Sequence, residues 1–201
     1  MKKILIIKSH TREESFCNAL TDKYIAGTRD ATNEIEVINL KDLALEPWLK
    51  YDHNVHGNLK LELSEDLLQA QKLILWSDHI VFSYPTYWSA PPALLKIFLE
   101  TILTPGFAYK YQRSFYNIIP RWNKLLKGRT ATIIATMDSP AFFTKFFDSD
   151  AGGKMMKSIL SFVGIKFKKK YYFGSVKMSD DKKKQAWLDS AYKIGKRTSA
   201  K

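Results

Sequence analysis

Short apolar runs alternate along this chain with longer segments in which apolar residues recur every three or four positions. This alternation is typical of βαβ units built around a parallel sheet. The apolar runs predict five strands, at residues 3–8, 35–39, 79–84, 130–136 and 171–176. The pattern therefore predicts an α/β fold, a doubly wound sandwich of three layers with helices on both faces of the sheet.

The segments between these strands carry signals for five helices. Ser15 is a typical N-cap, and Phe16, Leu20 and Tyr24 after it fall on one helix face. The other four helices are expected at 64–76 from Ser64, from Pro91-Pro92 to a stop at Gly106, at 155–162 before Gly164, and at 180–196 after a Ser179 cap. Two connections, 40–63 and 104–126, are longer than usual, and such loops are often functional.

The composition is that of one ordinary globular domain, which we expect to span residues 1–201. The 201 residues are 45% hydrophobic and 26% charged, enough for a sizeable core. No apolar run approaches the roughly 18 residues of a membrane span, and the first ten residues lack the hydrophobic stretch of a signal peptide, so we expect a cytoplasmic protein. Cys17 is the only cysteine, which excludes an internal disulfide and argues against a metal site built from cysteines, and we expect no metal.

The formal net charge is +12, and lysines cluster at 166–170, 182–184 and 193–201. A basic surface attracts nucleic acid, phosphorylated cofactors and anionic lipid alike, so the sign of the charge does not choose a partner. A solvated face and tail is the simplest interpretation. No nucleic-acid-binding motif accompanies the lysines, so we expect no nucleic-acid partner, while a peripheral membrane contact stays open.

Two loops at strand ends carry the candidate chemistry. The first, residues 9–16, contains no glycine, which excludes the dinucleotide and P-loop phosphate motifs. It offers instead a helix amino terminus at Ser15 with His10 and Arg12 nearby, a group that suits a phosphate; a plain N-cap and a surface histidine are the alternatives. The second loop, Pro85-Thr86-Tyr87-Trp88-Ser89, follows the third strand and suits a flat aromatic ligand. Both loops would emerge at the same sheet edge, where parallel sheets bind ligands.

At several points in order the chain resembles the flavin-dependent NAD(P)H:quinone oxidoreductase family. The matching segments are Ser9-His10-x-Arg12-x-x-Ser15-Phe16, Tyr84-Pro85-Thr86-Tyr87-Trp88, Pro92-Ala93-Leu94-Leu95-Lys96, Pro105-Gly106-Phe107-Ala108-Tyr109-Lys110-Tyr111, Ala135-Thr136-Met137-Asp138-Ser139-Pro140 and Ser158-Ile159-Leu160-Ser161-Phe162-Val163-Gly164-Ile165. Each segment alone is weak, whereas their order over nearly the whole chain is specific. The resemblance implies a flavodoxin-like sheet with strand order 2-1-3-4-5.

The resemblance also implies a set of site residues. The flavin phosphate and ribityl chain would be held by His10, Arg12, Ser15, Phe16 and the backbone of Cys17. The isoalloxazine ring would lie between Pro85, Thr86, Tyr87, Trp88 and Ser89 on one side and Thr136, Met137, Asp138 and Ser139 on the other. In this family the active site lies at a homodimer interface, so Tyr109 and Tyr111 would reach into the partner's site and Phe107 would form part of the pocket wall.

The chain departs from the family pattern at three places. Ser89 stands where the family usually has glycine, and Asp138-Ser139 replaces a glycine pair that many members have. Beyond that loop, Phe142-Phe143-Thr144-Lys145 replaces a segment that carries tyrosine and histidine in some relatives. A proton relay through such a pair is therefore not expected here.

The resemblance implies a flavoprotein that transfers hydride from NAD(P)H to a quinone or similar acceptor in a two-electron ping-pong cycle. Hydride chemistry belongs to the flavin, and FMN and FAD both stay open. An accessory subunit of a membrane transporter is the alternative from another functional class. A one-electron carrier is a third hypothesis, disfavoured because such carriers are commonly acidic and this chain is basic.

Overall fold

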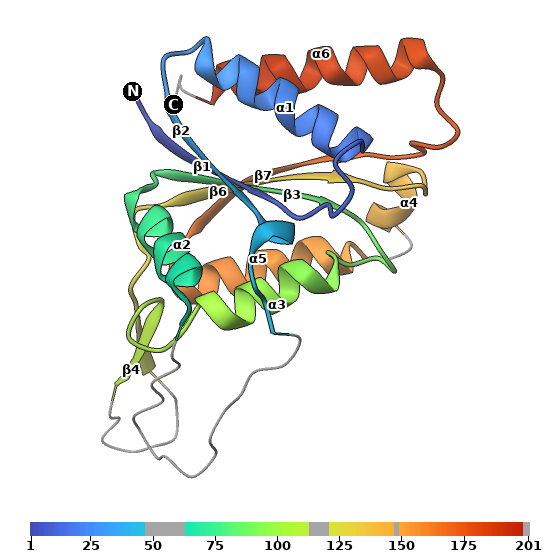
Figure 1. Cartoon of the computed structure of the whole chain (residues 1–201). Helices are drawn as coiled ribbons and strands as arrows, with labels where there is room; N and C mark the ends of the chain where they lie inside the picture. The colour runs from blue at the N-terminus through green and yellow to red at the C-terminus, as the bar shows by residue number, and fades with distance from the viewer. Residues whose placement is uncertain (47–62, 113–120, 147–148, 199–201) are drawn as a thin grey trace.

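The computed structural model describes residues 1–46, 63–112, 121–146 and 149–198, so parts of the two long connections and the end of the basic tail lie outside the described residues. A five-stranded parallel sheet forms the centre of the molecule (Figure 1). Its order is β2-β1-β3-β6-β7, with β1 Lys3–Lys8, β2 Glu34–Asn39, β3 His79–Pro85, β6 Thr130–Thr136 and β7 Lys166–Phe173.

The predicted strand order 2-1-3-4-5 must be corrected to 2-1-3-6-7: the five predicted parallel strands lie in the expected sequence across the sheet, but the prediction missed two strands of the chain. β4 Tyr109–Gln112 and β5 Arg121–Lys124 lie within the long connection 104–126 and pair antiparallel as a separate sheet. Both strands are largely polar and exposed, so no apolar run marks them in the sequence. The parallel sheet is therefore numbered 2-1-3-6-7 along the chain.

The last parallel strand also differs from its prediction at 171–176. β7 begins at Lys166 and ends at Phe173, and a register shift opposite Ala131/Thr132 interrupts its pairing with β6. Lysines dominate its first half because it is an edge strand, where charged side chains and bulges prevent pairing with another chain. Part of the basic cluster at 166–170 thus has a structural role.

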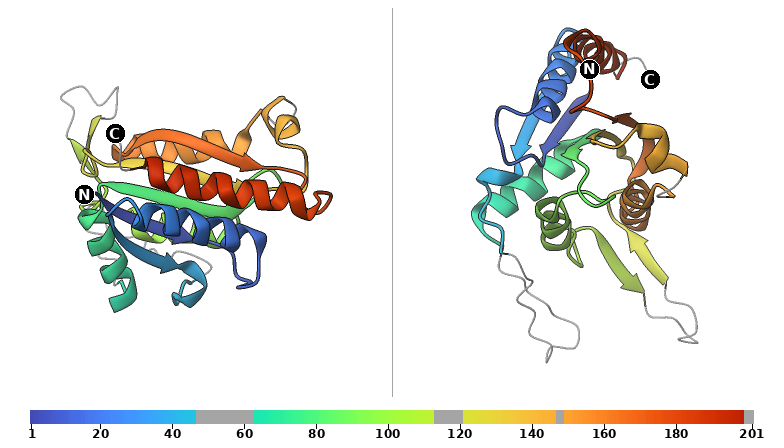
Figure 2. Two further views of the ribbon diagram at one scale, coloured as in Figure 1. Left: turned by 90° about the horizontal axis from the view of Figure 1, so that it is seen from above. Right: turned by 90° about the vertical axis from the view of Figure 1, so that its right-hand side faces the viewer.

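Helices cover both faces of the sheet (Figure 2). α1 Phe16–Arg29 and α6 Asp181–Arg197 pack on one face, and α2 Glu65–Trp76, α3 Ala93–Ile102 and α5 Ala151–Val163 pack on the other. The short helices η1 Leu40–Asp42 and α4 Ala141–Phe146 lie at the strand ends. Within the described ranges, no helix combines the length and apolar content that crossing a membrane requires.

Strand β1 shows how the two faces are built. Ile4 and Ile6 belong to the core under α1 and α6, whereas Leu5 and Ile7 belong to the core on the opposite face, and all four are fully buried. Successive side chains of a strand point to opposite faces, so a strand covered on both sides must be apolar throughout. This explains why uninterrupted apolar runs identified the parallel strands.

Side-chain caps set the beginnings of three helices. Ser15 accepts a hydrogen bond of 3.1 Å from the Asn18 amide at α1, and Ser64 caps α2 as predicted. At α6 the cap is Asp180, which accepts from the Lys183 amide at 2.8 Å, and the predicted cap Ser179 instead donates to the Ser175 carbonyl. α5 begins at residue 151 rather than 155 because its first turn contains two glycines, which weakened the helix signal.

Helices α1 and α6 approach closely because a glycine on each faces the other helix. A Cβ on Gly27 would lie 2.0 Å from the Tyr192 carbonyl oxygen, and a Cβ on Gly195 would lie 2.1 Å from the Tyr24 carbonyl oxygen. Any larger residue at either position requires the two backbones to separate.

Gly27→Ala and Gly195→Ala should each lower the free energy of unfolding by about 1–2 kcal/mol, because the steric cost exceeds the gain in helix propensity of about 1 kcal/mol. Urea denaturation followed by circular dichroism measures the change. Lys193→Ala, on the exposed side of α6, is the matched control and should change stability by less than about 0.5 kcal/mol. Equal stability of glycine variants and control would contradict the close packing.

His79 is a buried titratable group at the start of β3. Its Nδ1 lies 2.7 Å from Thr130 Oγ1, and its Nε2 has no hydrogen-bond partner in the part of the chain that the structure describes. Burial, with smaller contributions from the charges of Lys2 and Lys168, lowers the pKa of His79 to about 4. The ring is therefore neutral in the folded protein near neutral pH.

In the unfolded chain the pKa of His79 is about 6.5, so the unfolded state binds this proton first as the pH falls. The stability that neutral His79 contributes is present above about pH 6.5 and is lost as the pH falls through about 4. In His79→Asn, the fall in unfolding free energy over this window should be smaller by up to about 3 kcal/mol. Denaturant titrations at stepped pH test this, and parallel pH dependences of variant and natural protein would contradict it.

Candidate functional site

A cavity of about 580 Å³ opens at the carboxyl edge of the sheet. It lies at the loops after β1 and β3, where α1 leaves toward one face of the sheet and α3 toward the other (Figure 1). In an open parallel sheet this switch point is the usual ligand site. The structure brings all the predicted cofactor-binding residues together around this one cavity: His10, Arg12, Ser15, Phe16, Cys17, Pro85, Thr86, Tyr87, Trp88, Ser89, Thr136, Met137, Asp138 and Ser139.

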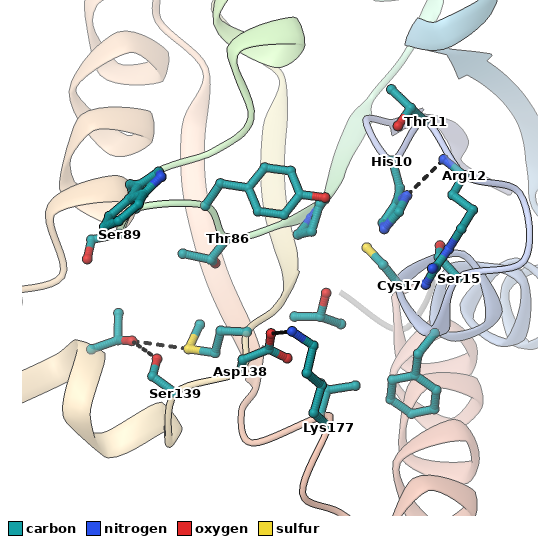
Figure 3. A pocket seen from close by; sticks show the side chains of 18 residues that line it. His10, Thr11, Arg12, Ser15, Cys17, Thr86, Ser89, Asp138, Ser139 and Lys177 are labelled. Carbon is teal, nitrogen blue, oxygen red and sulfur yellow. Dashed lines mark hydrogen bonds and ion pairs between the residues drawn. The ribbon is translucent and has the colours of Figure 1, made fainter.

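One end of the cavity is suited to an anion (Figure 3). The Arg12 amide donates a hydrogen bond of 3.0 Å to His10 Nδ1, so the neutral ring carries its proton on Nε2 and can donate it to a ligand. The amides of Phe16 and Cys17, at the start of α1, have no partner within the helix, whereas the Asn18 amide is capped by Ser15. A ring N–H, helix amides and a guanidinium thus converge on one place, as a phosphate requires.

The same geometry favours the neutral form of His10. Burial and, to a smaller extent, the positive charge of Arg12 lower the pKa of His10 below its ordinary value. Protonation would also break the hydrogen bond from the Arg12 amide, because Nδ1 would then carry a proton. His10 therefore acts here as a neutral donor.

The other end of the cavity is aromatic. Tyr87 and Ala90 exchange backbone hydrogen bonds of 2.9 and 3.0 Å, which closes a two-residue turn over Trp88 and Ser89. Trp88 is fully exposed and Tyr87 half exposed, so both rings are available to a ligand. Trp88 is therefore not a core residue.

The turn is conformationally strained. Trp88 and Ser89 both have positive φ, 48° and 59°, as in a type I′ turn, where glycine and asparagine are preferred. Left-handed backbone costs about 1–3 kcal/mol for other residues and concentrates at functional sites. This explains why glycine suits position 89 and identifies Ser89 as a strained substitute.

The loop after β6 forms the third wall. Asp138 and Ser139 do not have positive φ, so the backbone does not require a glycine pair here. The Asp138 carboxylate forms an exposed ion pair of 2.7 Å with Lys177, seen in Figure 3. The Met137 amide donates to the Phe173 carbonyl at 3.0 Å and is therefore engaged within the fold rather than with a ligand.

Four further residues line the cavity that the sequence prediction missed: Thr11, Thr144, Val176 and Lys177. Val176 and Lys177 follow β7, and they were missed because the predicted strand 171–176 extended too far. Thr144 belongs to α4, a helix of six residues that leaves no clear periodic signal. The rule that ligands bind beyond strand ends would have found Lys177 with the correct strand boundary.

Cys17 contributes to the cavity wall without exposing its thiol. Its side chain is buried, with Sγ 3.5 Å from Ser83 Oγ, and burial raises the pKa of the thiol. A protonated, buried thiol is a poor nucleophile. In the described ranges no group of three or more metal-binding side chains is placed to hold a metal ion.

Phe107, Tyr109 and Tyr111 do not line the cavity. Tyr109 packs edge-on against Phe162 at 5.1 Å and against Tyr111 at 5.3 Å between ring centroids. Both tyrosine rings therefore lie on one side of β4, because residues two apart on a strand point to the same face. Tyr109 borders a second groove, of about 380 Å³, between α3 and α5, and Tyr111 is 60% exposed. These residues therefore lie on a different surface from the cavity in the same chain.

Comparison with known proteins identifies the family. A sequence model described as flavodoxin-like fold matches residues 2–197. The chain belongs to this flavodoxin-like family. It is 26% identical over 190 residues to an uncharacterised NAD(P)H oxidoreductase of Haemophilus influenzae, an alignment that covers 93% of this chain and 91% of that protein.

A second relative and a solved structure are also similar to this chain. The flavodoxin-like chain is 26% identical over 162 residues to human ribosyldihydronicotinamide dehydrogenase (quinone), covering 72% of this chain and 67% of that protein. The structure of an FMN-dependent NADH-azoreductase from Bacillus anthracis in complex with FMN superposes with a TM-score of 0.73 at 20% identity, over 100% of this chain and 98% of that one. At that identity, the structural likeness supports the fold alone.

Ser89→Gly should raise the free energy of unfolding by about 0.5–1 kcal/mol, because glycine adopts positive φ without strain. Thermal denaturation measures the change. Ser190→Gly, in the middle of α6, is the matched control and should lower stability by about 0.5–1 kcal/mol. If both variants lost stability equally, the strain at position 89 would be absent.

Proposed function

We propose that this protein is a flavin-dependent oxidoreductase that binds FMN and transfers hydride from NAD(P)H to a quinone or related acceptor. The observation that carries this proposal is a single cavity that joins an anion-binding end at His10 and Ser15 to an exposed aromatic turn at Tyr87-Trp88. The oxidoreductase and quinone dehydrogenase names of the relatives support it, and they favour an enzyme over an accessory transporter subunit.

The residues present fit a flavin mononucleotide. The cavity volume of about 580 Å³ lies within the range typical of cofactor sites. His10 Nε2, the first-turn amides of α1 and Arg12 would hold the phosphate, and the turn 87–90 with the loop after β6 would hold the ring. The FMN in the Bacillus anthracis azoreductase supports FMN rather than FAD.

The flavin, when bound, accepts hydride from NAD(P)H and passes two electrons to the acceptor. The residues of the chain bind and orient the ligand: His10 would donate to the phosphate through Nε2, and the strained turn holds its aromatic rings in one place. The polar end fixes orientation, whereas the open aromatic end discriminates little between flat acceptors. Quinones and azo compounds therefore form one class of acceptor.

We also propose that the enzyme is a homodimer whose sites are shared. Phe107, Tyr109 and Tyr111 do not line their own cavity, and Tyr109 borders a groove that Leu99 and Ile159 also line, which suits contact with a second copy. Tyr111 would then complete the partner's acceptor site. Its location in the cytoplasm stays a prediction from the sequence.

Anaerobic spectroscopy tests the proposed function. The protein reconstituted with FMN should lose its yellow colour on addition of NADPH or NADH, and a soluble quinone should restore it. If neither nucleotide bleaches the bound flavin, the oxidoreductase proposal fails. If bleaching occurs but quinone does not reoxidise the flavin, the acceptor class is wrong.

His10→Ala should weaken FMN binding about tenfold, because a hydrogen bond to a charged phosphate is lost. Fluorescence quenching measures the dissociation constant. Riboflavin, which lacks the phosphate, is the matched control ligand and should bind variant and natural protein equally. Equal weakening of both ligands would show that His10 does not contact the phosphate.

Mixed dimers test the shared site. Ser15→Glu should abolish FMN binding by placing a carboxylate where the phosphate binds, and Tyr111→Ala should bind FMN but reduce quinone poorly. Neither homodimer should reduce quinone efficiently, whereas mixing and reassembly of the two variants should restore quinone reduction. In the mixed dimer, one site combines the intact cavity of the Tyr111→Ala subunit with the intact Tyr111 of the Ser15→Glu subunit. No recovery in a mixture that demonstrably forms heterodimers would contradict the shared site.

A further inference from the structure

The carboxylate of Asp150 is buried just outside the cavity and is bound by two side chains of the edge strand. Asp150 is 8% exposed and precedes the first turn of α5. Tyr172 donates a hydrogen bond of 2.5 Å to Asp150 Oδ1, and Lys170 forms an ion pair with Oδ2. A buried carboxylate is tolerated only when it is paired in this way, so the two contacts determine where Asp150 lies.

The backbone around Asp150 is bonded to two walls of the cavity. The Asp150 amide donates to the Thr144 carbonyl at 2.9 Å, and Thr144 lines the cavity with its hydroxyl donating to Met137 Sδ at 3.1 Å. The Gly152 amide, in the first turn of α5, donates to the Ser89 carbonyl at 3.0 Å. The start of α5 therefore holds both the loop after β6 and the aromatic turn.

These contacts also join two strained turns. Ser149 and Asp150 have φ of 50° and 55°, and Trp88 and Ser89 have φ of 48° and 59°. The Gly152 amide, two residues after Asp150, donates to the Ser89 carbonyl, and this hydrogen bond connects the two turns. Left-handed backbone at residues other than glycine persists only where surrounding contacts hold it, and the Asp150 side chain supplies such contacts at one end.

The packing leaves α5 little freedom to move. A Cβ on Gly153 would lie 2.5 Å from both Asp150 Oδ1 and the Tyr172 hydroxyl, and a Cβ on Gly152 would lie 2.7 Å from the Ser89 carbonyl oxygen. A displaced carboxylate would therefore displace the helix start, and with it the Ser89 turn.

We propose that Asp150 is a positioning residue for the ligand site: held by Tyr172 and Lys170, it sets the place of the first turn of α5 and thereby of the aromatic turn and the loop after β6. The ligand is taken as FMN, so this proposal rests on the proposed function.

The test compares FMN binding in Asp150→Asn, Tyr172→Phe and the natural protein. Both variants should weaken FMN binding about tenfold, because part of the binding free energy would then be spent on bringing the aromatic turn and the loop after β6 back into position. Both should also change the visible circular dichroism of bound FMN, because the turn against the ring shifts. Should Asp150→Asn not fold, Tyr172→Phe carries the test alone.

Tyr192→Phe is the matched control. It removes another tyrosine to aspartate hydrogen bond, from Tyr192 to Asp30, which joins α6 to the end of α1 and does not border the cavity. It should lower the melting temperature without changing FMN affinity or spectrum. If the Asp150 and Tyr172 variants behave like this control, their bonds are merely structural and the proposal is overturned.

The outcome separates this proposal from the proposed function. FMN that binds but is not bleached by NAD(P)H overturns the oxidoreductase function alone. Normal bleaching, with unchanged FMN affinity and spectrum in both variants, overturns the role of Asp150 alone. A natural protein that binds no FMN overturns both.

Discussion

The burial of strand β3 on both faces is the constraint on which the site depends. All seven residues from His79 to Pro85 are buried, and β3 is paired in parallel with β1 on one side and β6 on the other. Such a strand cannot slip, because its neighbours and both helical layers specify its register. The polypeptide therefore leaves the sheet at Pro85 between the loops of β1 and β6, and the three loops form the walls of one cavity.

Rigid support and strained backbone meet at this edge. Most of the described residues other than glycine that have positive φ lie in turns at the carboxyl edge of the sheet. They are Trp88, Ser89, Ser149, Asp150 and Ser175, whereas Thr32 lies elsewhere. Strain of this kind is stable only on a framework that opposes it. The buried sheet provides this framework. The hydrogen bond from the Gly152 amide to the Ser89 carbonyl fastens the aromatic turn to the start of α5.

Charge is divided between structural and ligand-related roles. The lysines of β7 protect an exposed sheet edge, and Lys170 compensates the buried charge of Asp150. Arg12 lies on the cavity, where its positive charge favours an anionic ligand, whereas the charge of Lys177 is paired there with Asp138. These local roles account for part of the net charge of +12, so the charge by itself does not indicate an acidic partner.

The sequence by itself determined the parallel strands apart from the bounds of the last one, the N-caps Ser15 and Ser64, and the loops after β1 and β3 at the cavity, because apolar runs, caps and strand-end loops are local features. It did not reveal β4 and β5, since short exposed strands are recognised by pairing rather than by composition. Some contacts join residues far apart in the chain. They are the ion pair between Asp138 and Lys177, and the contacts that the Asp150 carboxylate makes with Lys170 and Tyr172. Only the tertiary structure decided these contacts, because they depend on how β6, β7 and α5 pack and not on any short segment.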